Sequence, residues 1–273
     1  MDIKVIIPSS KLLQKHIYFY YILEEIDEEK ETSYLTFPNQ YNMVSFSFGV
    51  EIDYNKEKIC VNSSENKEII SDVIFRYNNP LLINYKGICK EISIAFKPLG
   101  VYSFFEGFSK IDSEGIYYKL VDFDIEVIKS ILEEDQKERI TERFESYLLS
   151  KYKEFVHPFL IDFTSDVMDG VEKPNDYYTD KFKISSKTFI KHCKQFLKRT
   201  PNEFKKVARF KRTLEEFGAS QKGLYSLTDL CYSNSFFDQA HMIKDFKSLT
   251  GYTPKDFFKK LSLENKGINW VYL

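Results

Sequence analysis

The sequence predicts an α+β protein of several domains. We expect an antiparallel β domain over residues 1–120, a helical connector over 121–160 and an all-α domain over 161–273. Three observations support this division: alternating apolar and polar residues fill the first part, a helical pattern follows, and the last third contains a repeat. A chain of 273 residues has room for two or more domains of ordinary size.

The first domain is predicted from short runs that are rich in β-branched and aromatic residues. Asn, Gly and Pro bound these runs, as is typical of strands and their turns. The clearest runs lie at residues 17–22, 43–48, 73–77, 81–85 and 92–96. Runs of this kind indicate an antiparallel sheet or barrel.

The connector changes to a helical period. From Asp124 to about Phe155, apolar residues recur at the three- and four-residue spacing of one helix face. The pattern is interrupted near residues 133–135, where three acidic residues follow one another. We therefore expect a helical segment with a break, and we place there the coupling between effector binding and the DNA-binding domain, alongside a dimer contact.

The last third contains a tandem repeat. Thr200–Phe204 (TPNEF) recurs 53 residues later as Thr253–Phe257 (TPKDF). The same offset aligns further pairs, among them Lys191 with Lys244, Lys194 with Lys247 and Ile190 with Ile243. Two copies of one helical unit therefore follow each other along the chain.

Local signals set the helix ends within each copy. Gly251 is typical of a helix C-terminus, and Thr253-Pro254 supplies an N-cap and a proline at the first helical position. Ser226 with Asp229 three residues later forms a near capping box. A short helix, a turn near residues 233–235 and a second helix make a helix-turn-helix, whose second helix commonly enters the DNA major groove.

Charge is divided unevenly between the two ends of the chain. Residues 181–261 carry 15 Lys and 3 Arg against 7 Asp and Glu, whereas the remainder carries 21 basic and 34 acidic residues. The total charge of −2 hides this division. A basic helical domain suits a polyanion, so the pattern predicts binding to double-stranded DNA.

The second copy carries the most specific resemblance. Leu230–Met242, followed by Gly251 and Thr253-Pro254, is similar to the signature of AraC/XylS-type transcription regulators. Ser235, Cys231 and Met242 replace the residues usual in that family. The resemblance implies two helix-turn-helix subdomains joined by a long helix, here from Pro201 to about Phe217. It also implies a sequence-specific transcription regulator.

The first copy departs more from the family pattern. Its opening helix falls on Asn175–Asp180, where helix propensity is poor. We expect this unit to be present but irregular. Ser185 or Ser186 is its predicted N-cap, and Lys198 stands where the second copy has Gly251.

Candidate DNA contacts are the outward residues near the start of each recognition helix, together with the linker arginine that the family resemblance implies. Gln239 and Lys191 are the favoured readers of base edges, because Gln pairs with adenine and Lys with guanine. Asp238 can serve equally as an N-cap. The full set is Ser186, Lys187, Lys191, Lys194, Arg209, Asp238, Gln239, His241, Lys244 and Lys247.

The β domain resembles, more weakly, the cupin-like sensor domains of the same family. This resemblance implies a small organic effector. Aromatic residues that alternate along the expected strands are the candidates for a pocket lining, and they favour a neutral or aromatic effector over a metal. The acidic residues are expected in loops and in the connector helix, which indicates solvation rather than a cationic ligand. The candidates are Tyr18, Tyr20, Phe46, Phe48 and Phe96.

Two other functions stay open. A ligand-independent, dimeric DNA-binding protein would use the β domain for dimerisation alone. A cupin-type enzyme with an accessory domain needs two or three histidines around a metal, but of four His in the chain only His16 lies near the expected strands. We therefore predict no enzyme, no metal and no cofactor.

The four cysteines and the N-terminus bear on the compartment. Cys60, Cys89, Cys193 and Cys231 are scattered without CxxC pairing, which favours a reducing cytoplasm. The N-terminal residues lack the apolar core of a signal peptide, and no run has the length of a membrane helix. A cytoplasmic homodimer is the expectation.

Overall fold

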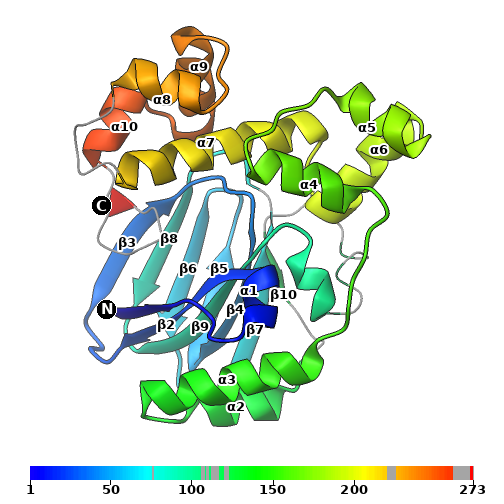
Figure 1. Cartoon of the computed structure of the whole chain (residues 1–273). Coiled ribbons are helices and arrows are strands. Elements are labelled where there is room, and N and C mark those ends of the chain that lie inside the picture. The colour runs from blue at the N-terminus through cyan, green and yellow to red at the C-terminus, as the bar shows by residue number, and fades with distance from the viewer. Residues whose placement is uncertain are drawn as a thin grey trace.

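The computed structural model describes residues 1–75, 77–105, 108, 111, 117–119, 123–219, 226–260 and 271–272. A β domain of two facing sheets lies below a layer of helices from the C-terminal part of the chain, and two further helices lie against its opposite end (Figure 1). The predicted fold class is confirmed: β-sheets come first in the chain and the helical region comes last.

Two sheets form the β domain. The six-stranded sheet has the order β1 (Asp2–Ile6), β2 (Ile17–Glu25), β9 (Cys89–Phe96), β4 (Asn42–Phe48), β7 (Ile69–Ile74) and β10 (Tyr117–Lys119). The five-stranded sheet has the order β11 (Val271–Tyr272), β3 (Glu31–Thr36), β8 (Leu81–Lys86), β6 (Lys58–Ser63) and β5 (Val50–Tyr54). Neighbours are antiparallel except β6 and β8, which are parallel.

The helices follow the β domain, apart from α1 (Lys11–His16) and the 3-10 turn η1 (Gly100–Ser103). The connector forms α2 (Ile125–Leu132) and α3 (Lys137–Lys151). The C-terminal region contains α4 (Leu160–Met168), α5 (Asn175–Phe182), α6 (Ser186–His192), the π-helical turn η3 (Cys193–Leu197), α7 (Pro201–Ala219), α8 (Leu227–Ser233), α9 (Gln239–Thr250) and α10 (Pro254–Lys260). No helix in the described ranges is long and apolar enough to span a membrane.

The six-stranded sheet has a different core on each of its two faces. Along β2, Tyr20 and Ile22 belong to a core that continues into the helices, whereas Phe19, Tyr21 and Leu23 belong to a core between the two sheets. The separation follows from the two-residue period of a strand. The sheet is therefore covered on both faces, and residues one position apart lie in different environments.

The connector packs on the six-stranded sheet. The ring of Phe144 in α3 lies 5.5 Å from that of Tyr20 and 6.2 Å from that of Phe46, measured between centroids. The buried carboxylate of Glu145 accepts hydrogen bonds from the Tyr20 hydroxyl at 3.0 Å and from the Ser9 amide at 3.0 Å. Helix α3 therefore belongs to the core of the β domain.

The helix ends of the repeat follow the sequence signals. Ser226 and Asp229 form a complete capping box, and Ser185 rather than Ser186 caps α6. Gly251 has φ 78°, and Lys198 has φ 56° at the equivalent position, so both copies stop in the left-handed conformation that favours glycine. Ser235, which replaces the family's glycine, also has positive φ.

The first unit is more regular than its sequence predicts. Asn175–Phe182 forms an α-helix despite its poor propensity, because Tyr178 is fully buried against Phe163 and Phe189. Tertiary packing of this kind commonly outweighs intrinsic propensity. The irregularity lies later, in the π-helical turn that follows α6.

Candidate nucleic-acid interface and ligand cavity

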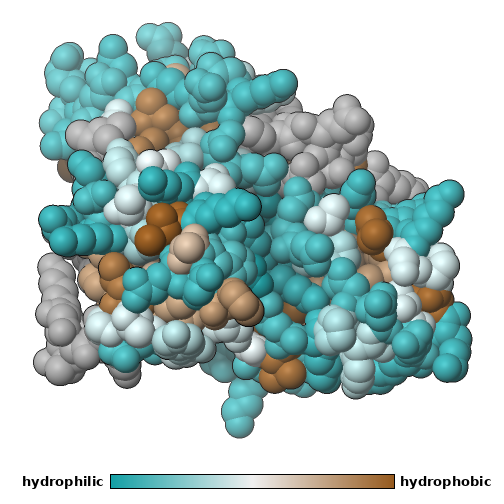
Figure 2. Space-filling model, turned by 90° about the horizontal axis from the view of Figure 1, so that it is seen from above, coloured by the Kyte–Doolittle hydropathy of each residue, from teal (hydrophilic) through white to brown (hydrophobic). Residues whose placement is uncertain are grey.

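Two helix-turn-helix units lie on the side of the molecule away from the sheets. One consists of α5 and α6, the other of α8 and α9, and α7 runs between them (Figure 1). Figure 2 looks down on this side: the surface is mainly hydrophilic, and the hydrophobic side chains form separate spots. A polar surface of this kind is suited to a highly charged partner.

The predicted contacts in the first unit are exposed. Ser186 and Lys187 lie in the first turn of α6, Lys191 lies in its last turn, and Lys194 follows in η3. In the second unit, Gln239, Lys244 and Lys247 are exposed along α9. The Gln239 amide donates to the Thr228 hydroxyl of α8 at 2.7 Å, which positions the side chain at the start of the recognition helix.

Asp238 and His241 have roles within the second unit. Asp238 is the N-cap of α9, because its carboxylate accepts from the His241 amide at 2.7 Å. The imidazole of His241 lies 3.4 Å from the Asp245 carboxylate and packs edge-on against Phe236. These contacts stabilise the start of the recognition helix.

Arg209 has a different role from the DNA contact that was expected. Its guanidinium is mostly buried and pairs with Glu172 at 2.7 Å and with Asp245 at 3.3 Å. It also lies over the Phe236 ring at 5.6 Å. Arg209 therefore ties the loop after α4 to α9, and it holds the two units together from the linker helix.

Several other basic residues of the C-terminal region point inward. Lys198 and Arg199 are buried and bind the β domain: the Lys198 amine donates to the Ile111 carbonyl at 2.9 Å. Lys205 is buried and donates to the Lys173 carbonyl, and Lys211 is buried in α7. Part of the basic excess therefore stabilises the fold and cannot reach phosphates.

Each recognition helix also exposes one isoleucine, which is not among the contacts predicted from the sequence. Ile190 in α6 is 39% exposed and Ile243 in α9 is 36% exposed. The two positions are equivalent in the repeat, so both helices present an apolar side chain beside a lysine. The sequence already indicated this equivalence, because the 53-residue offset of the repeat aligns Ile190 with Ile243.

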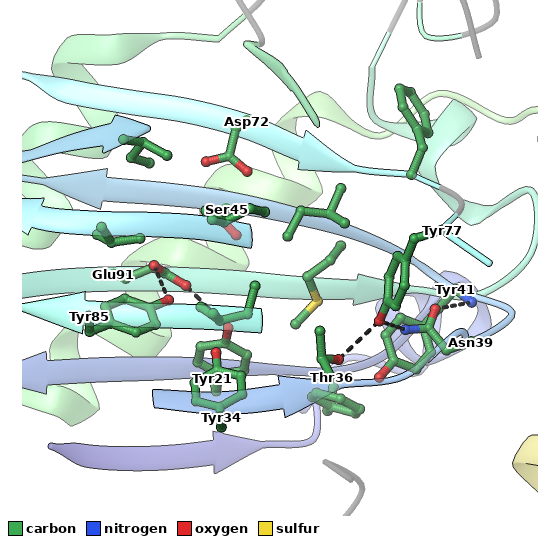
Figure 3. Close-up of a pocket in the computed structure, with 18 residues that line it drawn as sticks. Tyr21, Tyr34, Thr36, Asn39, Tyr41, Ser45, Asp72, Tyr77, Tyr85 and Glu91 are labelled. Atoms are coloured by element: carbon green, nitrogen blue, oxygen red, sulfur yellow. Dashed lines mark hydrogen bonds between the residues drawn. The ribbon is translucent and has the colours of Figure 1, made fainter. Parts of the chain in front are cut away.

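A cavity of about 70 Å³ lies between the two sheets of the β domain. Side chains from both sheets line it, as Figure 3 shows. Its polar members are Tyr21, Tyr34, Thr36, Asn39, Tyr41, Ser45, Asp72, Tyr77, Tyr85 and Glu91, and apolar residues such as Met43 and Ile74 lie between them.

Glu91 is the centre of one end of the cavity. Its buried carboxylate accepts from the hydroxyls of Tyr85 at 2.8 Å, Tyr21 at 3.2 Å, Ser47 at 3.2 Å and Ser93 at 2.5 Å. Burial, reinforced by the Glu91 charge, raises the pKa of both tyrosines well above the usual value. Both therefore stay protonated as donors.

Tyr77 is the centre of the other end. Its hydroxyl donates to the Phe37 carbonyl at 2.7 Å and lies 3.0 Å from the Thr36 hydroxyl and 3.4 Å from the Asn39 amide (Figure 3). Burial raises the pKa of Tyr77 to about 12, so its hydroxyl is neutral at pH 7.

This end of the cavity adjoins the DNA-binding units. Phe37 leaves the β domain and enters the core of the second unit, where its ring lies 4.8 Å from that of Phe257. Arg199, just before α7, donates to the Tyr77 carbonyl at 3.1 Å and to the Asn78 amide oxygen at 3.0 Å. Phe37 and Tyr77 therefore lie where the cavity and the helical region meet.

The five aromatic residues expected to bind an effector lie elsewhere. Tyr20, Phe46 and Phe96 belong to the helix-covered core, and Phe48 packs against it. Tyr18 lines a second, open depression between the β domain and α4. The first four lie on the opposite face of their strands from the cavity. The described lining of the cavity therefore lacks these four, and it also lacks Tyr18.

The histidines lie in three places. His16 packs against Phe104, and His241 lies in the second unit. His157 and His192 face each other, with Nε2 and Nδ1 3.0 Å apart, and burial together with the neighbouring ring lowers the pKa of His157 to about 4. No three His, Cys, Asp or Glu side chains within the described residues are grouped to hold a metal ion.

The fold and the interface define a DNA-binding protein of the helix-turn-helix class. The family model described as a helix-turn-helix domain matches residues 178–260, from α5 to the end of α10. The C-terminal domain is thus an AraC-type helix-turn-helix domain, which confirms the resemblance found in the sequence.

Among solved structures, several of ToxT from Vibrio cholerae are similar to this chain. ToxT from strain O395 is 11% identical with a TM-score of 0.40, over 88% of this chain and 96% of that one. Unsaturated fatty acid bound ToxT from strain SCE256 is 10% identical (TM-score 0.41, 87% and 94% covered). ToxT bound to (E)-4-(8-methylnaphthalen-1-yl)but-3-enoic acid is 11% identical (0.41, 95% and 99%). A search of curated proteins found no match.

Replacing Gln239 with Ala should relax base preference at one position of the DNA site, at a cost of roughly 1–3 kcal/mol. Lys247→Ala should weaken binding to all sequences alike, because a lysine on phosphate carries no sequence information. Binding of both variants to a panel of single-base site variants distinguishes the two effects. Uniform weakening by both would show that α9 does not read a base through Gln239.

Ile243 should contact the 5-methyl group of a thymine, since apolar side chains in the major groove recognise that group. In a site selected from random DNA, replacing the contacted thymine by uracil should cost about 0.8 kcal/mol, or roughly fourfold in Kd. The Ile243→Ser variant should be indifferent to that replacement, and Ile88→Ser, in the turn between β8 and β9, should behave as the wild type. Equal sensitivity of all three proteins would rule the contact out.

Proposed function

We propose that this protein is a transcription regulator whose two helix-turn-helix units bind DNA under the control of a small organic effector in the cavity between the sheets. The main support for this proposal is the position of Tyr77. Tyr77 lines the cavity, and its hydroxyl donates a hydrogen bond to the carbonyl of Phe37, whose side chain belongs to the core of the second unit. A ligand that displaces Tyr77 would therefore act on the DNA-binding domain directly.

The route of this control runs through the segment around Phe37 and through Arg199. Phe37 is buried on Phe257, and burying a phenylalanine contributes about 1.5–3 kcal/mol. Coupling between an effector site and a second site typically amounts to about 1–3 kcal/mol. The free energy of this one contact is thus large enough that its loss or strengthening would change the affinity for DNA.

Arg199 provides a second link to the linker helix. It precedes α7, which carries the cores of both units, and its guanidinium is held by the backbone and side chain of residues 77–78. Movement at Tyr77 would change the position of Arg199 and hence the relation between the two recognition helices. Their spacing decides whether both can enter successive major grooves.

We further propose a homodimer that acts in the cytoplasm, with α2 and α3 at the contact. Helices α2 and α3 lie at the end of the molecule away from the DNA-binding units (Figure 1). They carry the exposed apolar side chains of Ile125, Val127 and Leu149. A dimer through this end would leave both pairs of recognition helices accessible.

The alternative is a dimer that binds DNA independently of any ligand, and a Tyr77 variant tests it. A screen of small organic molecules for raised thermal stability provides a cavity ligand. Such a ligand should change the affinity of the wild type for DNA. In Tyr77→Phe the ligand should still bind, because the ring remains. The ligand-induced change in DNA affinity should be at least threefold smaller, because the hydrogen bond to the Phe37 carbonyl is lost.

Tyr54→Phe is the matched control, since this exposed tyrosine of β5 lies outside the cavity lining. In Tyr54→Phe the ligand should change the affinity for DNA as much as it does in the wild type. The affinity of all three proteins is measured by fluorescence anisotropy titration with labelled DNA. A ligand that stabilises the protein and leaves DNA affinity unchanged in the wild type would favour the ligand-independent alternative.

The dimer is tested by sedimentation of the full chain. The wild type should sediment as a dimer, and Leu149→Glu in α3 should shift it to a monomer, because a charge in an apolar contact is costly. Ile88→Glu, at a similarly exposed apolar position of the β domain, should leave the dimer intact. A monomeric wild type at micromolar concentration, or an unaffected Leu149→Glu, contradicts this contact.

A further inference from the structure

We propose that the cavity between the sheets binds the head group of an organic cation, an alkylammonium or guanidinium ion, against Glu91 and the surrounding tyrosine rings. This inference rests on the proposed function, since it names the chemical class of the effector. It also revises the expectation of a neutral effector that the aromatic composition suggested.

Glu91 is a buried acidic group with no basic partner among the residues that the structure describes. Its side chain is 3% exposed, and its four hydrogen-bond partners among the described residues are all hydroxyls. Hydroxyls satisfy the oxygen atoms but leave the negative charge uncompensated. A buried charge is costly unless an opposite charge or a metal accompanies it. The site is therefore stabilised by a cation.

The charge of Glu91 meets no basic group in the described part of the lining. Glu91 comes from β9, and no Lys, Arg or His is found among the described lining residues. The hydroxyls of Ser45 in β4 and Ser93 in β9 lie 2.6 Å apart. A carboxylate ligand would meet repulsion here, whereas a cation would meet acceptors.

The walls around Glu91 are aromatic. The rings of Tyr34 and Tyr85, from the facing sheet, stack at 6.3 Å with an interplanar angle of 21°, and Tyr21 approaches Glu91 from the neighbouring strand β2 of the same sheet (Figure 3). Aromatic faces carry partial negative charge, so they attract ammonium and guanidinium ions within about 6 Å. An inorganic ion is usually held by several charged or imidazole ligands, and no three His, Cys, Asp or Glu side chains are grouped among the described residues.

The size of the cavity limits the head group. About 70 Å³ has room for roughly two water molecules, or for an ion as small as methylguanidinium. Both the Glu91 end and the Tyr77 end line this one small cavity (Figure 3). A cation held by Glu91 would therefore lie close to the end that adjoins the DNA-binding units.

The test compares three probes of similar shape on the full chain: methylguanidinium, N-methylurea and acetate, which are positive, neutral and negative. Binding is measured by calorimetry and ligand-observed NMR. Methylguanidinium should bind at least tenfold more tightly than the other two. Glu91→Gln should remove this preference, and Glu57→Gln, which makes the same charge change at an exposed position, should retain it.

A second variant guards against a folding defect in Glu91→Gln. Tyr34→Leu keeps the carboxylate and removes one ring face, so it should weaken methylguanidinium several-fold and leave acetate unaffected. DNA binding by each variant confirms that it is folded.

Three outcomes overturn the proposal: N-methylurea binds as tightly as methylguanidinium, Glu91→Gln binds methylguanidinium as the wild type does, or the wild type does not bind it at tens of millimolar. None of these outcomes affects the proposed regulatory function, because that function is judged by the change in DNA affinity and not by the charge of the ligand.

Discussion

The two-residue period of the strands is the constraint on which the arrangement of both cores and of the cavity depends. In β9, Ile92 and Ile94 face the helices while Glu91 and Ser93 face the second sheet. A register shift of one residue would exchange these sets and bury a carboxylate against α2 and α3. The helix-covered face of β9 is therefore apolar, and its other face brings polar groups between the two sheets.

The boundary between the β domain and the helical region is not a simple linker. Phe37 completes the core of the second unit, and β11 near the C-terminus pairs with β3 of the five-stranded sheet. Tyr102 of η1 donates to the Phe196 carbonyl at 2.9 Å, so the first unit is also attached. Because these contacts are shared, a change in the β domain alters the surroundings of both DNA-binding units.

The basic residues of the helical region serve two purposes that the charge count does not separate. Lys187, Lys191, Lys244 and Lys247 lie on exposed helix faces, where phosphates can approach. Arg199 and Arg209 lie inside and hold the domains and the units in place. We propose that the first group provides affinity for a polyanion; the second group holds the units in the positions from which the first would act.

The sequence by itself determined the order of the domains, the tandem units and most of their helix ends. These features depend on local spacing, capping and the repeat, as with Ser226, Gly251 and the Thr-Pro restart. The tertiary structure alone decided the lining of the cavity and the role of Arg209. Both depend on contacts between distant segments: alternation showed two strand faces but not which one met the second sheet, and the charge of Arg209 did not reveal Glu172 and Asp245 beside it.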